Sequence, residues 1–123
     1  MNKRRHVINR SRKRYRNGFQ LHDLWTLDST IATFCAEAVR QFIAMDRHTY
    51  PGFDEADTPE KWELVLQEIL WSLERMANDY EDAPAWGRKG HTVEEDIEAQ
   101  KEYNARVDEG LRLFGKYLRH MND

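Results

Sequence analysis

A short stretch in the first half of the chain combines residues that could hold an anionic ligand. Arg40, Arg47 and His48 supply hydrogen-bond donors and positive charge, and Tyr50 supplies an aromatic ring. Arginine presents forked N–H groups that match the oxygens of a phosphate, and tyrosine offers a stacking face. The turn sequence Tyr50-Pro51-Gly52 would hold the ring in place, so the stretch favours a pocket for an anionic, nucleotide-type ligand. The alternative is that Tyr50 and Phe53 close the end of a helical core while Arg40 and Arg47 pair with nearby acids.

The first sixteen residues form a second cationic segment. They carry eight lysines and arginines and no acid, whereas the rest of the chain has eleven lysines and arginines against all twenty-two acids. The net charge of −3 therefore divides into a basic arm and an acidic body, which suggests an anionic partner for the arm. Basic residues around an aromatic ring bind phosphate backbones without sequence preference. The residues predicted to contact a nucleic acid are Arg10, Arg12, Lys13, Arg14, Tyr15 and Arg16.

The arm has two further interpretations. In the first, Arg14 and Arg16 contact the same anionic ligand as the Arg40–Tyr50 stretch, because arginine N–H groups bind its charge. Alternatively, the arm is a solubilising or subunit-contacting tail that the acidic body attracts and that competes with nucleic acid.

No combination of residues predicts catalysis or a metal site. The five histidines are scattered, with no pair at i and i+4 and no Glu-x-x-His motif. The serines and Cys35 lack the context of an activated nucleophile, and the Gly87–Gly90 segment is too short for a phosphate loop. We therefore expect a protein that is not an enzyme and needs neither a cofactor nor a metal.

The four tryptophans divide into two groups. Trp25 and Trp62 fall on apolar helix faces and are expected in the core. Trp71 lies off such a face and Trp86 falls in a predicted loop, so both are assigned to an interaction surface, with Trp71 as a homo-oligomer contact.

Composition limits the compartment and the number of domains. A chain of 123 residues makes one domain, and a single cysteine forms no internal disulfide, which favours a reducing compartment. No apolar stretch approaches the roughly 20 residues of a membrane helix. We expect a cytoplasmic protein with no membrane partner.

The apolar periodicity predicts an all-α fold, a small antiparallel three-helix bundle. Residues 1–17 form the basic arm and residues 18–123 the helical domain, with helices at about 29–47, 59–80 and 93–120. Thr58-Pro59 and the capping box Thr92–Glu95 mark two helix starts. The first helix has an apolar stripe formed by Leu24, Leu27, Ile31, Phe34, Ala38, Phe42 and Met45. The last has one formed by Ile97, Gln100, Asn104, Val107, Leu111, Phe114, Leu118 and Met121.

Several short motifs resemble those of a group of short proteins encoded by tailed phages and prophages. These motifs are Asp23-Leu24-Trp25-Thr26-Leu27-Asp28, Tyr50-Pro51-Gly52, Pro59-Glu60-Lys61-Trp62 and the closing Glu109-Gly110-Leu111-Arg112-Leu113-Phe114-Gly115-Lys116-Tyr117. The chain departs from that pattern at Cys35-Ala36-Glu37, which replaces a proline-containing stretch, and at Arg119-His120-Met121, where a tryptophan is usual. The resemblance implies a phage product in the bacterial cytoplasm and assigns no chemistry.

These observations predict a non-catalytic phage-type binding protein. It would counter host defence by binding a host protein or by sequestering a nucleotide-type signal. One alternative is a nucleic-acid-binding accessory protein of phage replication or packaging that acts through the basic arm. The other is a structural or assembly component.

Overall fold

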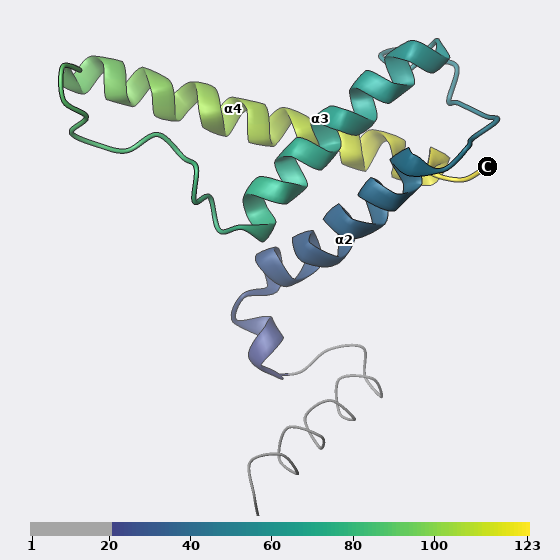
Figure 1. Cartoon of the computed structure of the whole chain (residues 1–123), viewed down its shortest axis with the longest axis horizontal. Coiled ribbons are helices and arrows are strands. Elements are labelled where there is room, and N and C mark those ends of the chain that lie inside the picture. The colour runs from purple at the N-terminus through teal and green to yellow at the C-terminus, as the bar shows by residue number, and fades with distance from the viewer. Residues whose placement is uncertain (1–20) are drawn as a thin grey trace, which may run out of the picture.

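The protein is all-helical over the part of the chain that the computed structural model describes, residues 21–123. Three α-helices follow one another, α2 (Leu27–Ala44), α3 (Pro59–Ala77) and α4 (Val93–Tyr117), as Figure 1 shows. Short 3-10 helices flank them at η1 (Leu21–Leu24) and η2 (Leu118–His120). Residues 21–123 contain no β-strand, so the all-α prediction is confirmed. The basic arm, predicted at residues 1–17, lies outside the described residues.

Both predicted helix starts are confirmed by their caps. The Thr58 hydroxyl accepts a hydrogen bond from the Lys61 N–H at 3.1 Å, and Pro59 takes the first helical position. Thr92 and Glu95 form the expected capping box, with the Thr92 hydroxyl 3.1 Å from the Glu95 nitrogen. Each cap satisfies N–H groups that have no partner within their own helix.

The end of α3 comes earlier than the sequence indicated. The helix was expected to reach Tyr80 but ends at Ala77, because Asp79 and Tyr80 both have a positive φ, 55° and 58°. This left-handed backbone cannot continue a right-handed helix.

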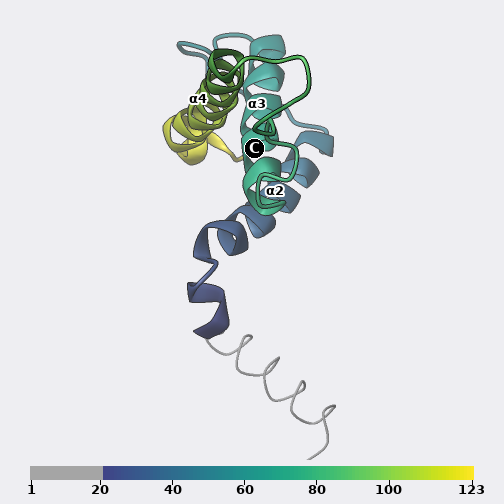
Figure 2. The same cartoon turned by 90° about the vertical axis from the view of Figure 1, so that its left-hand side faces the viewer.

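Helix α3 is the central element. Figure 2 shows it between α2 and α4, and Figure 1 shows that α2 runs alongside it in the opposite direction while α4 crosses it. No Cα atom of α2 lies within 8 Å of one in α4. The described helices therefore form an open arrangement, and the closed antiparallel three-helix bundle is not confirmed.

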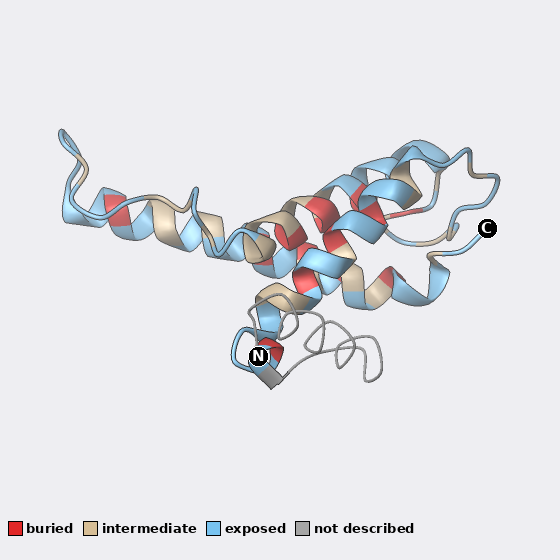
Figure 3. Ribbon diagram, turned by 60° about the horizontal axis from the view of Figure 1, so that its bottom comes forward, coloured by how far each residue is buried: buried red, intermediate tan, exposed pale blue. Residues whose placement is uncertain are grey.

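The core forms where α2 and the second half of α4 meet α3 (Figure 3). On α3 the sequence predicts a core face of Trp62, Val65, Leu66, Ile69, Leu73, Met76 and Tyr80, and the first five of these are buried. On α4 the predicted face is displaced by about one position, because the buried residues of its second half are Val107, Gly110, Leu113 and Tyr117. Of the predicted stripe, Val107 is the residue that is fully buried.

The predicted core face of α2 was wrong. The residues that α2 buries are the small side chains Ala32, Ala36 and Val39. The larger stripe predicted for the core is exposed along most of its length, and Phe34 is 75% exposed. Trp25, also predicted in the core, is 81% exposed. Small residues allow α2 to approach α3 closely. When α2 packs through these residues, the larger side chains of the predicted stripe, such as Ile31 and Phe34, point away from α3.

Helices α3 and α4 cross at short range at Gly110. A Cβ atom on Gly110 would lie inside contact distance of the Ser72 side chain and 2.7 Å from the Glu68 carbonyl oxygen. The buried Ser72 hydroxyl donates a hydrogen bond to the Arg106 carbonyl at 3.2 Å. Glycine is therefore required at this crossing, and the next helical glycine, Gly115, has open space around it.

Tyr117, the last residue of α4, packs the end of that helix against the segment before α3. Its ring is fully buried between Phe53 and Trp62, with ring centroids 5.3 Å and 5.6 Å away. Its hydroxyl donates to the Phe53 carbonyl at 3.1 Å and lies 2.9 Å from Glu55 Oε1. Hydrogen bonds from Lys116, then from Arg112, hold the pKa of Glu55 well below its usual range.

Candidate functional site

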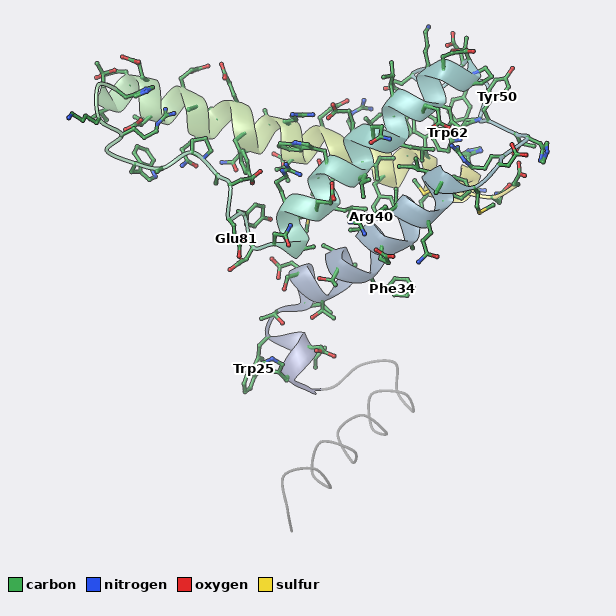
Figure 4. All side chains as sticks on the ribbon, viewed as in Figure 1. Trp25, Phe34, Arg40, Tyr50, Trp62 and Glu81 are labelled. Atoms are coloured by element: carbon green, nitrogen blue, oxygen red, sulfur yellow. The ribbon has the colours of Figure 1, made fainter. Side chains whose placement is uncertain are left out.

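A pocket of about 380 Å³ opens where α2 ends and α3 begins. Figure 4 shows Tyr50 and Trp62 at this end of the molecule. The wall is formed by the last turn of α2, the connecting segment and the first turns of α3. Its lining residues are Ile43, Met45, Asp46, Arg47, His48, Thr49, Tyr50, Pro59, Trp62 and Glu63. The volume falls within the range of small-molecule sites.

The pocket gathers three of the six residues predicted to contact the anionic ligand. Arg47, His48 and Tyr50 all line it. Arg40 does not, because its guanidinium points toward α3 and pairs with Glu37 and, at 3.1 Å, with Glu74 (Figure 4). The other two predicted contacts lie in the arm, as does the whole predicted nucleic-acid set, so they fall outside the described residues.

The Arg47 guanidinium is held inside the wall of this pocket. Its side chain is only 6% exposed, and Nη2 pairs with Glu63 and donates to the Ile43 carbonyl at 3.4 Å. The guanidinium carbon lies 4.9 Å from the centre of the Phe42 ring. The Nε atom is buried without a hydrogen-bond partner. An unpaired buried donor is costly, and an anion that reached this edge of the guanidinium would relieve it.

The segment beside the pocket already holds an anion, the side chain of Asp123. Asp123 Oδ1 accepts hydrogen bonds from the backbone N–H groups of His48 and Thr49 at 2.7 Å and 2.9 Å. The Thr49 hydroxyl lies 3.0 Å from the same oxygen, and His48 Nδ1 lies 3.1 Å from Oδ2. Successive backbone N–H groups that converge on one oxygen form an anion-binding nest. We call this group of donors the His48–Thr49 nest.

Tyr50 leaves its ring available to a ligand. Tyr50 is 46% exposed. Phe53, the other residue of the core-closing interpretation, packs on Tyr117, and its ring centre lies 5.1 Å from that of His120. The interpretation of Tyr50 as a core-closing residue is therefore disfavoured by its placement, and stacking on a flat ligand is open to it.

The two tryptophans assigned to an interface lie in different surroundings. Trp71 is half-buried, with the Arg106 and Arg75 guanidinium carbons 4.0 Å and 4.5 Å from its ring centre. These stacked arginines cover much of the ring surface that a partner would need. Trp86 lies in the loop between α3 and α4 and is exposed. The assignment of both residues to an interface stays a prediction.

Sequence reasoning did not find two contributors to this site. Glu63 faces Arg47 from α3, and Asp123 reaches the nest from the other end of the chain. Neither has a local signal, because each is identified only by a contact between segments far apart in sequence.

No group of three or more His, Cys, Asp or Glu side chains within residues 21–123 could hold a metal ion. None of the described helices is long and apolar enough to cross a lipid bilayer. No family model matches this chain, and no curated protein or solved structure shows significant similarity to it.

The nest makes a testable contribution to stability in acid. The His48 backbone N–H, followed by its imidazole, lowers the pKa of Asp123 to about 2, so the folded chain binds this proton more weakly than the unfolded chain. The resulting stabilisation is complete above the usual carboxyl pKa and is lost as the pH falls from about 4 towards 2. We expect Asp123→Asn to narrow the difference between the unfolding free energies at pH 7 and pH 3 in urea titrations. Asn122→Ser, a change at an exposed, uncharged neighbour, is the control and should not narrow this difference.

Proposed function

We propose that this chain is a non-catalytic, phage-type binding protein that acts in the bacterial cytoplasm and counters host defence by sequestering an anionic, nucleotide-type signal. The observation that carries the proposal is that Arg47, His48 and Tyr50 line one pocket beside a nest that already accepts a carboxylate. The antiparallel bundle expected from the sequence, preceded by the basic arm, is the proposed scaffold.

The phosphate of the ligand takes the place of the Asp123 carboxylate. The His48 and Thr49 N–H groups and the Thr49 hydroxyl then donate to phosphate oxygens, as they now do to Asp123 Oδ1. Hydrogen bonds to an ionised acceptor are the stronger kind. The base or ribosyl portion lies in the pocket against the exposed Tyr50 ring, where stacking contributes about 1–3 kcal/mol per base.

Acidic residues in the pocket wall reduce the electrostatic attraction between the pocket and an anionic ligand. Asp46 and Glu63 also line the pocket, and Glu63 pairs with Arg47. The pocket therefore lacks a strong positive field. Aimed N–H donors and ring stacking, which lose little when salt is added, supply the affinity instead.

Calorimetric titration with cyclic AMP, ADP-ribose and a cyclic dinucleotide tests the proposal. For the nucleotide that binds, Tyr50→Leu should weaken affinity about 5- to 150-fold because stacking is lost. Asp123→Asn should strengthen affinity, since the competing carboxylate loses its charge. Arg40→Met, which alters a surface cation outside the pocket, is the matched control. Equal affinity of the Tyr50→Leu and unchanged proteins would contradict the site.

The nucleic-acid alternative rests on the division of charge in the sequence. Its residues lie in the arm, outside the described part of the chain, so it stays a prediction. Deletion of residues 3–16 should abolish salt-sensitive binding of an oligonucleotide and leave a nucleotide site in the body intact.

A further inference from the structure

The donors of the His48–Thr49 nest match an anion that has two free oxygens and one negative charge. Both carboxylate oxygens of Asp123 are in contact with the nest. Oδ1 faces the two backbone N–H groups and the Thr49 hydroxyl, at 2.7, 2.9 and 3.0 Å, and Oδ2 faces His48 Nδ1 at 3.1 Å. The backbone and hydroxyl donors carry no net charge, so they stabilise one negative charge without supplying a cation for a second.

The pocket beside the nest adds acidic charge to this environment. Asp46 and Glu63 both line the pocket, and the arginine of the lining, Arg47, already pairs with Glu63. A second negative charge on the ligand would lie near these two carboxylates, while the charge of Arg47 is already balanced. Like charges at short range repel each other more strongly where a ligand has displaced water.

Arg47 offers the ligand a hydrogen-bond donor more than it offers charge. Its side chain is 6% exposed, and the Nε atom is buried without a hydrogen-bond partner. A neutral oxygen of a ligand, such as an ester or ribose oxygen, can accept a hydrogen bond from an arginine N–H group. The donors around the pocket therefore favour a ligand with neutral oxygens around one charged group.

Two classes of phosphate differ in these properties. A phosphodiester has two free oxygens and a single negative charge, whereas a phosphate monoester has three free oxygens and a charge of about −1.5 to −2 at pH 7. The diester reproduces the charge and the number of free oxygens of the Asp123 carboxylate that occupies the nest. Its two bridging ester oxygens are neutral, so they are better suited than a third charged oxygen to a wall that contains carboxylates.

We propose that the pocket binds a singly charged phosphodiester, such as a cyclic nucleotide, and selects it over phosphate monoesters. This inference rests on the proposed function and narrows its ligand to one class of phosphate. The nest holds the two charged oxygens, the ester oxygens lie toward Asp46 and Glu63, and the nucleoside stacks on Tyr50. A monoester binds more weakly because its second charge lies close to the two carboxylates.

Calorimetric titration of the full chain at pH 8 with three adenine nucleotides tests this selection. Cyclic AMP and adenosine 5′-(methyl phosphate) are diesters with one charge, and AMP is the monoester with the same base and sugar. We expect both diesters to bind about 10-fold more tightly than AMP, because AMP brings one more charge near a carboxylate. If AMP bound as tightly as its methyl ester, this inference would be overturned, whereas the proposed function would stand because a nucleotide binds.

Asp46→Asn supplies a second measurement. Asp46 is exposed, so the variant should fold, and loss of its charge should reduce the preference for the methyl ester over AMP by about 3-fold. Glu102→Gln is the matched control, since Glu102 is an exposed acid of α4 outside the pocket lining and should leave the preference unchanged. An unchanged preference in Asp46→Asn would overturn the inference. So would the absence of binding by all three nucleotides, and the titrations with ADP-ribose and a cyclic dinucleotide then decide the proposed function separately.

Discussion

Replacement of Gly110 by alanine should lower the free energy of unfolding by about 1–3 kcal/mol, the usual cost of an added methyl group in a packed core. The new Cβ would collide with the Ser72 side chain and the Glu68 carbonyl of α3. The backbone carbonyl cannot rotate away as a side chain can, so the two helices must separate. Separation would also break the hydrogen bond from Ser72 to the Arg106 carbonyl.

Gly115 supplies the matched control on the same helix. No atom lies within 4 Å of a Cβ built at Gly115, so Gly115→Ala should stabilise the protein by about 0.5–1 kcal/mol through helix propensity. Urea unfolding of both variants at one pH gives the two values directly. If Gly110→Ala also stabilised the protein, the close crossing of α3 and α4 would be wrong.

Replacement of Tyr117 by alanine should destabilise the protein by about 3–5 kcal/mol, as removal of a large buried aromatic does. The ring fills the space between Phe53 and Trp62, and its loss leaves a cavity that these rings cannot close. The same change removes the hydroxyl contacts with the Phe53 carbonyl and Glu55.

Tyr117→Phe separates the ring from the hydroxyl. It keeps the packing and removes the hydrogen bonds, and Glu55 retains Arg112 and Lys116 as partners. We therefore expect a loss of only about 1 kcal/mol. Thermal and urea unfolding of the two variants measure the difference. Equal losses for Tyr117→Ala and Tyr117→Phe would show that the buried ring adds little.

The helices could be predicted from the sequence more reliably than the faces they bury. Thr58 and Thr92 identify helix starts because a cap acts within three residues. The apolar periodicity places the core face of α2 at its largest apolar residues, yet α3 packs on the smaller Ala32 and Ala36. On α4, Gly110 is buried for close approach, which a search for apolar periodicity does not detect.

The candidate site was predictable only where its residues are neighbours in sequence. Arg47, His48 and Tyr50 come from one short segment, so their shared position in the pocket follows from local sequence. The carboxylate in the nest comes from Asp123, and the partner of Arg47 comes from α3. These contacts depend on how distant segments pack, which single-sequence patterns do not encode.

Native mass spectrometry at moderate salt tests the central claim most directly. The full chain would be sprayed alone, with a pool of cyclic and ADP-ribose-type nucleotides, and with a short mixed-sequence oligonucleotide. The account predicts a nucleotide adduct at one fixed stoichiometry per chain, which is lost in Tyr50→Leu. A chain that binds no nucleotide in the pool, or that binds one equally well after Tyr50→Leu, would contradict it.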